Sequence, residues 1–119
     1  MVDVNKEAEK ALSSLPYTVR FYYPEQFNAL PVISFYNLSE RGAFGYDDAE
    51  VISRGRVQVD VWTDTPADCG KIAIEAAEAM ISRGWTREMS MDVPKTDGIY
   101  HRTLRFVKDF INSGGIYYA

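Results

Sequence analysis

The chain has 119 residues, a hydrophobic content of 46% and a formal net charge of −4. This length fits a single domain over residues 1–119, and the apolar content excludes a largely disordered chain. The acidic balance argues against a protein that grips nucleic acid by neutralising phosphates, because such binding needs a basic face.

The first predicted elements are a helix and two aromatic strands. Residues 1–16 hold a short helix, because apolar residues recur at helical spacing before Pro16. Residues 17–23 and 32–37 alternate and are rich in β-branched and aromatic residues, which predicts strands. Aromatic residues of both parities cannot all enter one core, so some cover a second layer or meet a partner.

Residues 38–50 are the longest segment without a regular pattern, and we predict a flexible loop there. Gly42 and Gly45 loosen the backbone, whereas Phe44 and Tyr46 are apolar groups in polar surroundings. Two interpretations stay open. The segment is a plain hairpin loop, or it is a mobile arm that orders on a partner with its two aromatic residues as anchors.

Residues 53–84 combine an alternating strand with a well-capped helix. Val57, Val59 and Val61 share one face of the strand. The opposite face carries Arg56, Gln58, Asp60 and Trp62. Thr65 is the predicted N-cap of the helix, which ends at Gly84.

The helix that follows is rich in alanine and should lie close to the sheet. Its predicted buried stripe consists of Cys69, Ile72, Ala73, Ala76 and Met80, widened by Ile74, Ala77 and Ile81. A cysteine on a buried stripe is expected to be structural rather than reactive.

A hairpin and a tail complete the chain. Residues 85–92 alternate Trp85, Arg87, Met89 and Met91 against polar residues, residues 94–98 form a turn, and residues 99–108 form the return strand. Residues 109–119 are expected to be a flexible tail that frays or docks on another chain through Tyr117 and Tyr118.

These elements predict an α+β fold. A mixed, mainly antiparallel β-sheet of about four to five strands packs against one long Ala-rich helix, with a short N-terminal helix beside it. One cysteine and one histidine exclude an internal disulfide and argue against a zinc site. No apolar run approaches the roughly 20 residues that span a bilayer, and no signal peptide is recognisable. We expect a cytosolic chain without cofactor, metal or membrane partner.

The sequence carries no catalytic signature. It has neither a glycine-rich phosphate loop nor a G-x-S-x-G nucleophile turn. A small enzyme that uses His101 with Asp92 or Asp97 is the weaker alternative to a non-enzymatic protein. The four sheet arginines are Arg54, Arg56, Arg102 and Arg105. They are expected to form cross-strand ion pairs with Asp60 and Glu88, the sharper alternative being a basic stripe for DNA or an acidic partner.

Four stretches carry a resemblance to a known family: LPVI at 30–33, RVQVDVW at 56–62, AAEAMISRGW at 76–85 and YHRTLRF at 100–106. With the order of elements over residues 17–108, the chain resembles the tail-completion or tail-terminator proteins of long-tailed bacteriophages and prophages. These are also called tail-to-head joining proteins.

The resemblance implies a non-enzymatic virion subunit. Members of that family form rings, usually hexamers, that end tail-tube polymerisation and provide the surface for head attachment. The implied partners are other copies of the chain, the tail tube protein and a neck or head-completion protein. DNA would pass through the ring without specific binding. The chain would reside at the head–tail junction of the virion, and in the host cytoplasm during assembly.

Two alternatives stay open beside the tail terminator: a head-completion or neck protein of the same virion, and a small acidic binding or adaptor module. The family supplies no site residues that transfer to this sequence. From their chemistry, the candidate interface residues are Phe44, Tyr46, Arg54, Arg56, Trp62, Arg102, Arg105, Tyr117 and Tyr118.

Overall fold

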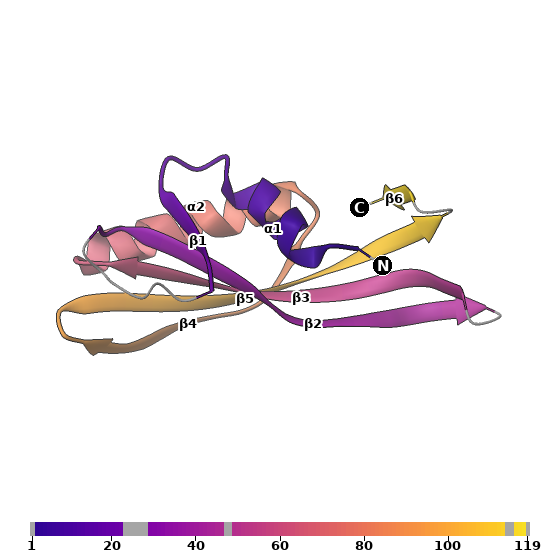
Figure 1. The fold of residues 1–119 in the computed structure, drawn as a ribbon. Coiled ribbons are helices and arrows are strands. Elements are labelled where there is room, and N and C mark those ends of the chain that lie inside the picture. Colours follow the sequence, from indigo (N-terminus) through magenta and orange to yellow (C-terminus); the bar gives the residue numbers. More distant parts are fainter. Residues whose placement is uncertain (1, 23–28, 47–48, 114–115, 119) are drawn as a thin grey trace.

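The computed structural model describes residues 2–22, 29–46, 49–113 and 116–118, and places two helices on one side of a twisted sheet (Figure 1). The elements are α1 (Val4–Leu12), β1 (Thr18–Phe21), β2 (Val32–Tyr46), β3 (Ala49–Thr63), α2 (Pro66–Ser82), β4 (Thr86–Thr96), β5 (Ile99–Ser113) and β6 (Ile116–Tyr118). The sheet order is β1-β2-β3-β5-β4, with β6 paired to the end of β5. β1 runs parallel to β2 and the other pairs are antiparallel, so the predicted mixed α+β fold is confirmed.

The core lies between the helices and the central strands. Val57, Val59 and Val61 of β3 are fully buried there, as their alternation predicts. The Thr65 side chain accepts a hydrogen bond from the Asp68 amide and confirms the predicted N-cap. α2 has 17 residues, which is an ordinary helix length rather than a long one.

The predicted buried stripe of α2 is too wide. Ile74 and Ile81 are 62% and 52% exposed, whereas the stripe from Cys69 to Met80 is buried as expected. Small alanines let α2 lie flat on β3 and β5, so the sheet contacts a narrow strip of the helix. The two isoleucines lie outside that strip and face a cleft of about 290 Å³ beside β4 and β5.

The predicted loop at residues 38–50 is wrong for most of its length. β2 continues to Tyr46 and β3 begins at Ala49, so the segment is a long hairpin. Register shifts after Asn37 and near the two glycines absorb the irregular sequence as bulges. Residues 38–46 and 49–56 form a projection that we call the arm, and the molecule measures 53 × 24 × 22 Å (Figure 1).

The predicted tail from residue 109 is strand in its described residues, 109–113 and 116–118. β5 runs to Ser113, and β6 folds back to pair with Ile111–Ser113. Phe110 explains the extension, because its fully buried ring packs edge-on against Trp85 at a centroid distance of 5.8 Å. In the sequence, the continuation of this strand past residue 108, its predicted end, is therefore marked by a single aromatic residue, Phe110.

The predicted β4–β5 hairpin is confirmed, but its turn is shorter than the predicted residues 94–98, because β4 runs to Thr96. Asp97 and Gly98 have φ values of 52° and 77°, which suit a two-residue hairpin turn. A bulge between Arg87 and Met89 breaks the predicted alternation of β4. Met89 thus lies on the sheet face opposite Trp85, rather than on the same one.

Gly55 lets α1 approach β3 closely. A Cβ atom built at Gly55 would lie 2.8 and 2.9 Å from the two methyl carbons of Val4. Gly55→Ala is therefore expected to lower the free energy of unfolding by about 1–3 kcal/mol, because the short Val4 side chain has little room to move. Chemical denaturation checks this, with Gly70→Ala as control, since a Cβ there meets nothing within 4 Å. Equal effects of the two substitutions would contradict the close packing.

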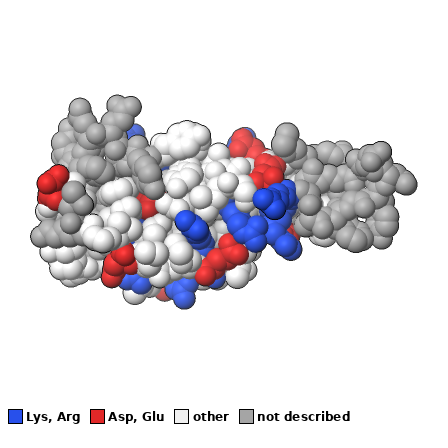
Figure 2. All heavy atoms as spheres, turned by 90° about the horizontal axis from the view of Figure 1, so that it is seen from below, with Lys and Arg blue, Asp and Glu red and all other residues white. Residues whose placement is uncertain are grey.

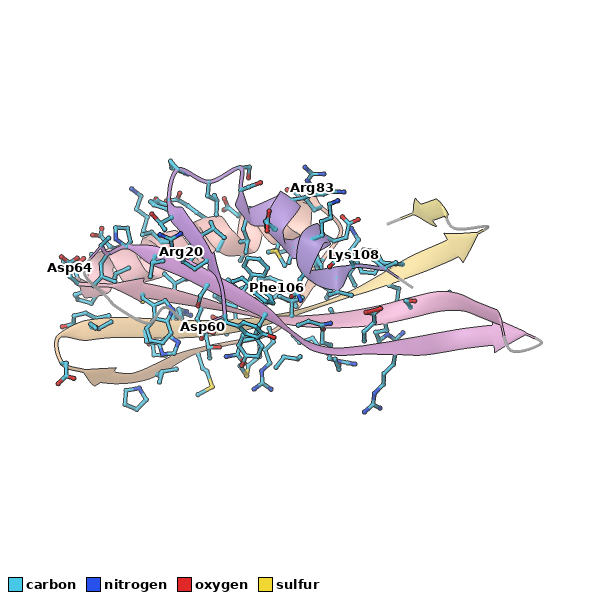
Figure 3. All side chains as sticks on the ribbon, viewed as in Figure 1. Arg20, Asp60, Asp64, Arg83, Phe106 and Lys108 are labelled. Atoms are coloured by element: carbon cyan, nitrogen blue, oxygen red, sulfur yellow. The ribbon has the colours of Figure 1, made fainter. Side chains whose placement is uncertain are left out.

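Lys108 is a buried cation at the end of α2. Its Nζ donates a hydrogen bond to the Arg83 carbonyl oxygen, near the rings of Trp85 and Phe110 (Figure 3). Burial lowers the pKa of Lys108 below its ordinary value of 10.5.

This lowered pKa predicts a pH dependence. Between the folded pKa and 10.5 the unfolded chain binds more protons, so the contribution of Lys108 to stability rises with pH. In denaturation at several pH values, the stability of the natural protein relative to Lys108→Met should increase toward pH 10.5. A constant or falling difference would contradict the lowered pKa.

Candidate functional site

The sheet face away from the helices holds four of the nine predicted interface residues. Alternation along β3 and β5 places Arg54, Arg56, Trp62 and Arg105 on this face, which we call the open face. Figure 2 views the molecule from that side, and positive and negative side chains lie next to each other where the described surface meets the arm.

Two arginines of the arm are held in ion pairs. Arg54 forms a two-pronged pair with Asp109, at 2.8 Å from Nε to Oδ1 and 3.1 Å from the second nitrogen to Oδ2. Arg56 Nε lies 3.2 Å from Glu88 Oε1. The hydrogen bond from Arg54 lowers the pKa of Asp109, and the same bond raises the pKa of Arg54.

These pairs support one of the two sequence interpretations. Cross-strand pairing of Arg56 with Glu88 is confirmed. Both pairs are partly exposed and contribute little stability, but they neutralise the charges that a phosphate-binding stripe would need. Arg105 Nε donates to Gln58 Oε1 at 3.4 Å.

Asp60 is not an arginine partner, and the predicted pairing there is wrong. Its carboxylate is fully buried, and Oδ1 lies 2.6 Å from Nε2 of His101. Gln58 Nε2 donates to the same carboxylate at 3.1 and 3.4 Å. Figure 3 places Asp60 on the side of the sheet away from the helices.

An aromatic ring covers this polar cluster. Trp62 stacks on His101, with ring centroids 3.6 Å apart and planes at 15°. The Trp62 indole N–H donates to Ser34 Oγ at 3.0 Å, which fixes the ring across β2, β3 and β5. Trp62 therefore covers the contact between His101 and the buried Asp60 carboxylate, and its own ring stays partly exposed.

The cluster corrects the enzyme alternative. His101 pairs with Asp60, not with Asp92 or Asp97, because Asp60 lies across the β3–β5 ladder on the same face. Asp92 instead contacts Arg102 at 3.4 Å, and Asp97 lies in the hairpin turn. A histidine with an orienting carboxylate also occurs in nucleophilic sites. Here the pair joins neighbouring strands β3 and β5 across the open face.

Arg102 lies on the other side of the sheet, apart from the three remaining arginines. It is in register with Val61, on the helix side, and its Nε donates to Ser90 Oγ at 2.9 Å. There it lines the cleft beside α2. The four arginines therefore do not form one stripe.

The aromatic candidates lie on strands rather than on flexible segments. Phe44 and Tyr46 belong to β2 in the arm, and Tyr117 and Tyr118 belong to β6. Their side chains lie outside the described part of the structure, so their contact roles stay predictions.

Sequence reasoning missed an exposed apolar group near the base of the arm. Phe21, Tyr22 and Leu38 are 49%, 59% and 36% exposed. The available signal was the aromatic surplus of both parities in the first two strands, which predicted outward rings without saying which ones.

The described residues include no group of three or more His, Cys, Asp or Glu side chains placed to hold a metal ion. No helix in the described part of the chain is long and apolar enough to cross a membrane. A scan against protein-family models finds no match, and no curated protein matches the sequence.

Proposed function

We propose that this chain is a non-enzymatic structural subunit of a long-tailed phage or prophage virion. It caps the tail tube as a ring, which we expect to be a hexamer, ends tail polymerisation and provides the attachment surface for the head. Its partners are other copies of itself, the tail tube protein and a neck or head-completion protein. The sequence resemblance names this role, and the shape of the subunit supports it.

The observation that carries the proposal is the elongated sheet. A body covered by two helices continues into the arm, and the sheet ends in β1 and β2 on one side and in β4 on the other (Figure 1). Two different edges of one sheet suit head-to-tail association, which closes into a ring when the rotation between copies allows it.

The charges support a subunit that lies beside DNA without binding its phosphates tightly. The chain carries a net charge of −4, and Arg54 and Arg56 are engaged with carboxylates. A ring of such subunits would let DNA pass without releasing the many counterions that tight phosphate binding requires.

Size-exclusion chromatography with light scattering tests the proposal against a monomeric adaptor. We expect a concentration-dependent species with the mass of a closed ring, and binding of the protein to purified tail tubes. A strictly monomeric protein at every concentration that ignores tail tubes would refute the proposal. Fractionation of virions separates the neck alternative, because a tail terminator copurifies with headless tails whereas a head-completion protein copurifies with tailless heads.

A further inference from the structure

β1 leaves the edge of β2 early. It pairs with β2 only from Val32 to Phe35, although β2 runs on to Tyr46. Among the described strands, none pairs with the outer edge of β2 beyond Phe35. A strand edge of this length is a template for another strand, and proteins usually protect it.

A strained residue ends β1 at this point. Tyr22 has a φ of 61°, a left-handed conformation that is unfavourable for a bulky residue. Its amide donates to the Phe35 carbonyl oxygen at 2.9 Å, which among the described residues is the last backbone hydrogen bond between this segment and β2. Strain of this kind persists where the surrounding structure enforces it and concentrates at functional positions.

Exposed apolar side chains rim the same edge. The Phe21 and Tyr22 rings lie 4.0 Å apart, and Tyr22 and Tyr36 lie 6.1 Å apart. Leu38 is the residue that the bulge leaves out of register with β3, and it is 36% exposed. A strand edge flanked by apolar groups is the usual form of a strand-addition site, in which backbone bonds give affinity and side-chain contacts give specificity.

Two of the registers in which this edge could pair with itself bring like charges together. In a two-fold antiparallel pair centred on Glu40, that carboxylate meets its own copy, and a pair centred on Arg41 opposes two guanidinium groups. A different partner strand avoids both of these oppositions.

β4, at the opposite edge of the sheet, has the required direction. Each step from β2 through β3 and β5 to β4 is antiparallel, so β4 runs opposite to β2. A second copy in the same orientation can thus add its β4 to the β2 edge as an antiparallel strand. β4 presents Met91, 49% exposed, on the open face, and Arg41 of β2 is exposed on the same face.

We infer that the outer edge of β2 beyond Phe35 receives β4 of a second copy of this chain. The contact is head-to-tail, and its repetition builds the ring. This inference rests on the proposed function and deepens it by naming the surface between neighbouring subunits.

Cysteine cross-linking tests the pairing directly. Ser39→Cys and Arg41→Cys mark the β2 edge, whereas Met89→Cys and Met91→Cys mark β4, and all four lie on the open face by register. Opposed residues of an antiparallel pair are close enough for a disulfide. Mixtures of one β2 variant with one β4 variant should give a mixed dimer on oxidation, and the corresponding double variant should give a ladder.

The cross-link pattern decides the outcome. Dimers that form only within a single β2 variant would mean two-fold pairing and would overturn the inference. The absence of any mixed dimer in concentrated protein would also overturn it. Rings that form without these cross-links would refute this contact while leaving the proposed function standing.

A charged substitution beside the β2 edge gives a second test. Leu38→Lys should weaken self-association by about tenfold or more, because a charged side chain blocks strand addition at an edge. Ile74→Lys is the matched control, because Ile74 is an exposed apolar residue on α2, away from this edge. Unchanged association of Leu38→Lys, or an equal loss in both variants, would count against the β2 edge.

Discussion

His101→Ala is expected to lower the free energy of unfolding by about 3–5 kcal/mol, because it leaves the buried Asp60 carboxylate without its imidazole partner. The Asp60 carboxylate is fully buried, and the imidazole lies 2.6 Å from it. Without the imidazole, Gln58 remains as its hydrogen-bond donor among the described side chains. The substitution also removes the ring on which Trp62 stacks.

Denaturant titration followed by circular dichroism measures this effect. Asp92→Asn is the matched control, because that carboxylate also pairs with a cation on β5 but is 79% exposed, and its loss should change stability by less than about 1 kcal/mol. The double variant Asp60→Asn/His101→Ala should recover part of the loss, since it leaves no buried charge. A stable His101→Ala protein that has lost an enzymatic activity would instead favour the enzyme alternative.

Trp85→Ala is the second substitution with a large expected effect, a loss of about 3–5 kcal/mol. Trp85 follows Gly84, which turns the chain out of α2 with a φ of 92°, and its ring is almost fully buried. It packs against Phe110 and lies beneath the Lys108 ammonium, 6.0 Å from the ring centroid. Truncation opens a cavity where α2, β4 and β5 meet.

Thermal and chemical unfolding of Trp85→Ala should be compared with Ile81→Ala. Ile81 is 52% exposed near the same end of α2, so its truncation should cost less than about 1 kcal/mol. Equal effects of the two substitutions would contradict the position of Trp85 in the core. Hydrogen exchange adds a local test, because the amides of β5 near Phe110 should lose protection with Trp85.

The sequence predicted the body of the fold because its patterns are local. Val57, Val59 and Val61 alternate at the period of a strand, and Thr65 with Pro66 marks a helix start. The structure confirms both features. Each of these patterns depends on residues that are neighbours along the chain, so it can be recognised in a single sequence.

The arm and the tail were missed because tertiary contacts override local signals. Glycines in residues 38–46 suggested a loop, yet pairing with β3 accommodates them at bulges. The tail lacks a regular pattern, but Phe110 is buried against Trp85, and β5 continues to Ser113. Local periodicity identifies neither β3 as the partner of residues 38–46 nor Trp85 as the partner of Phe110.

The interface candidates were predicted in part for the same reason. Alternation placed Arg56 and Trp62 correctly on the open face, because strand parity fixes the face of a side chain. It could not reveal that Asp60, on the same face, is buried under a stacked Trp62 and His101. That burial depends on the register between β3 and β5, which local patterning leaves undetermined.

Electron microscopy of tail tubes tests the central claim most directly. The tail tube and tape-measure proteins of the same phage or prophage would be produced with and without this chain. The account predicts ring-shaped caps on one end of tubes of uniform length when the chain is present, and tubes of uncontrolled length when it is absent. Tubes whose ends and lengths are the same in both samples would contradict it.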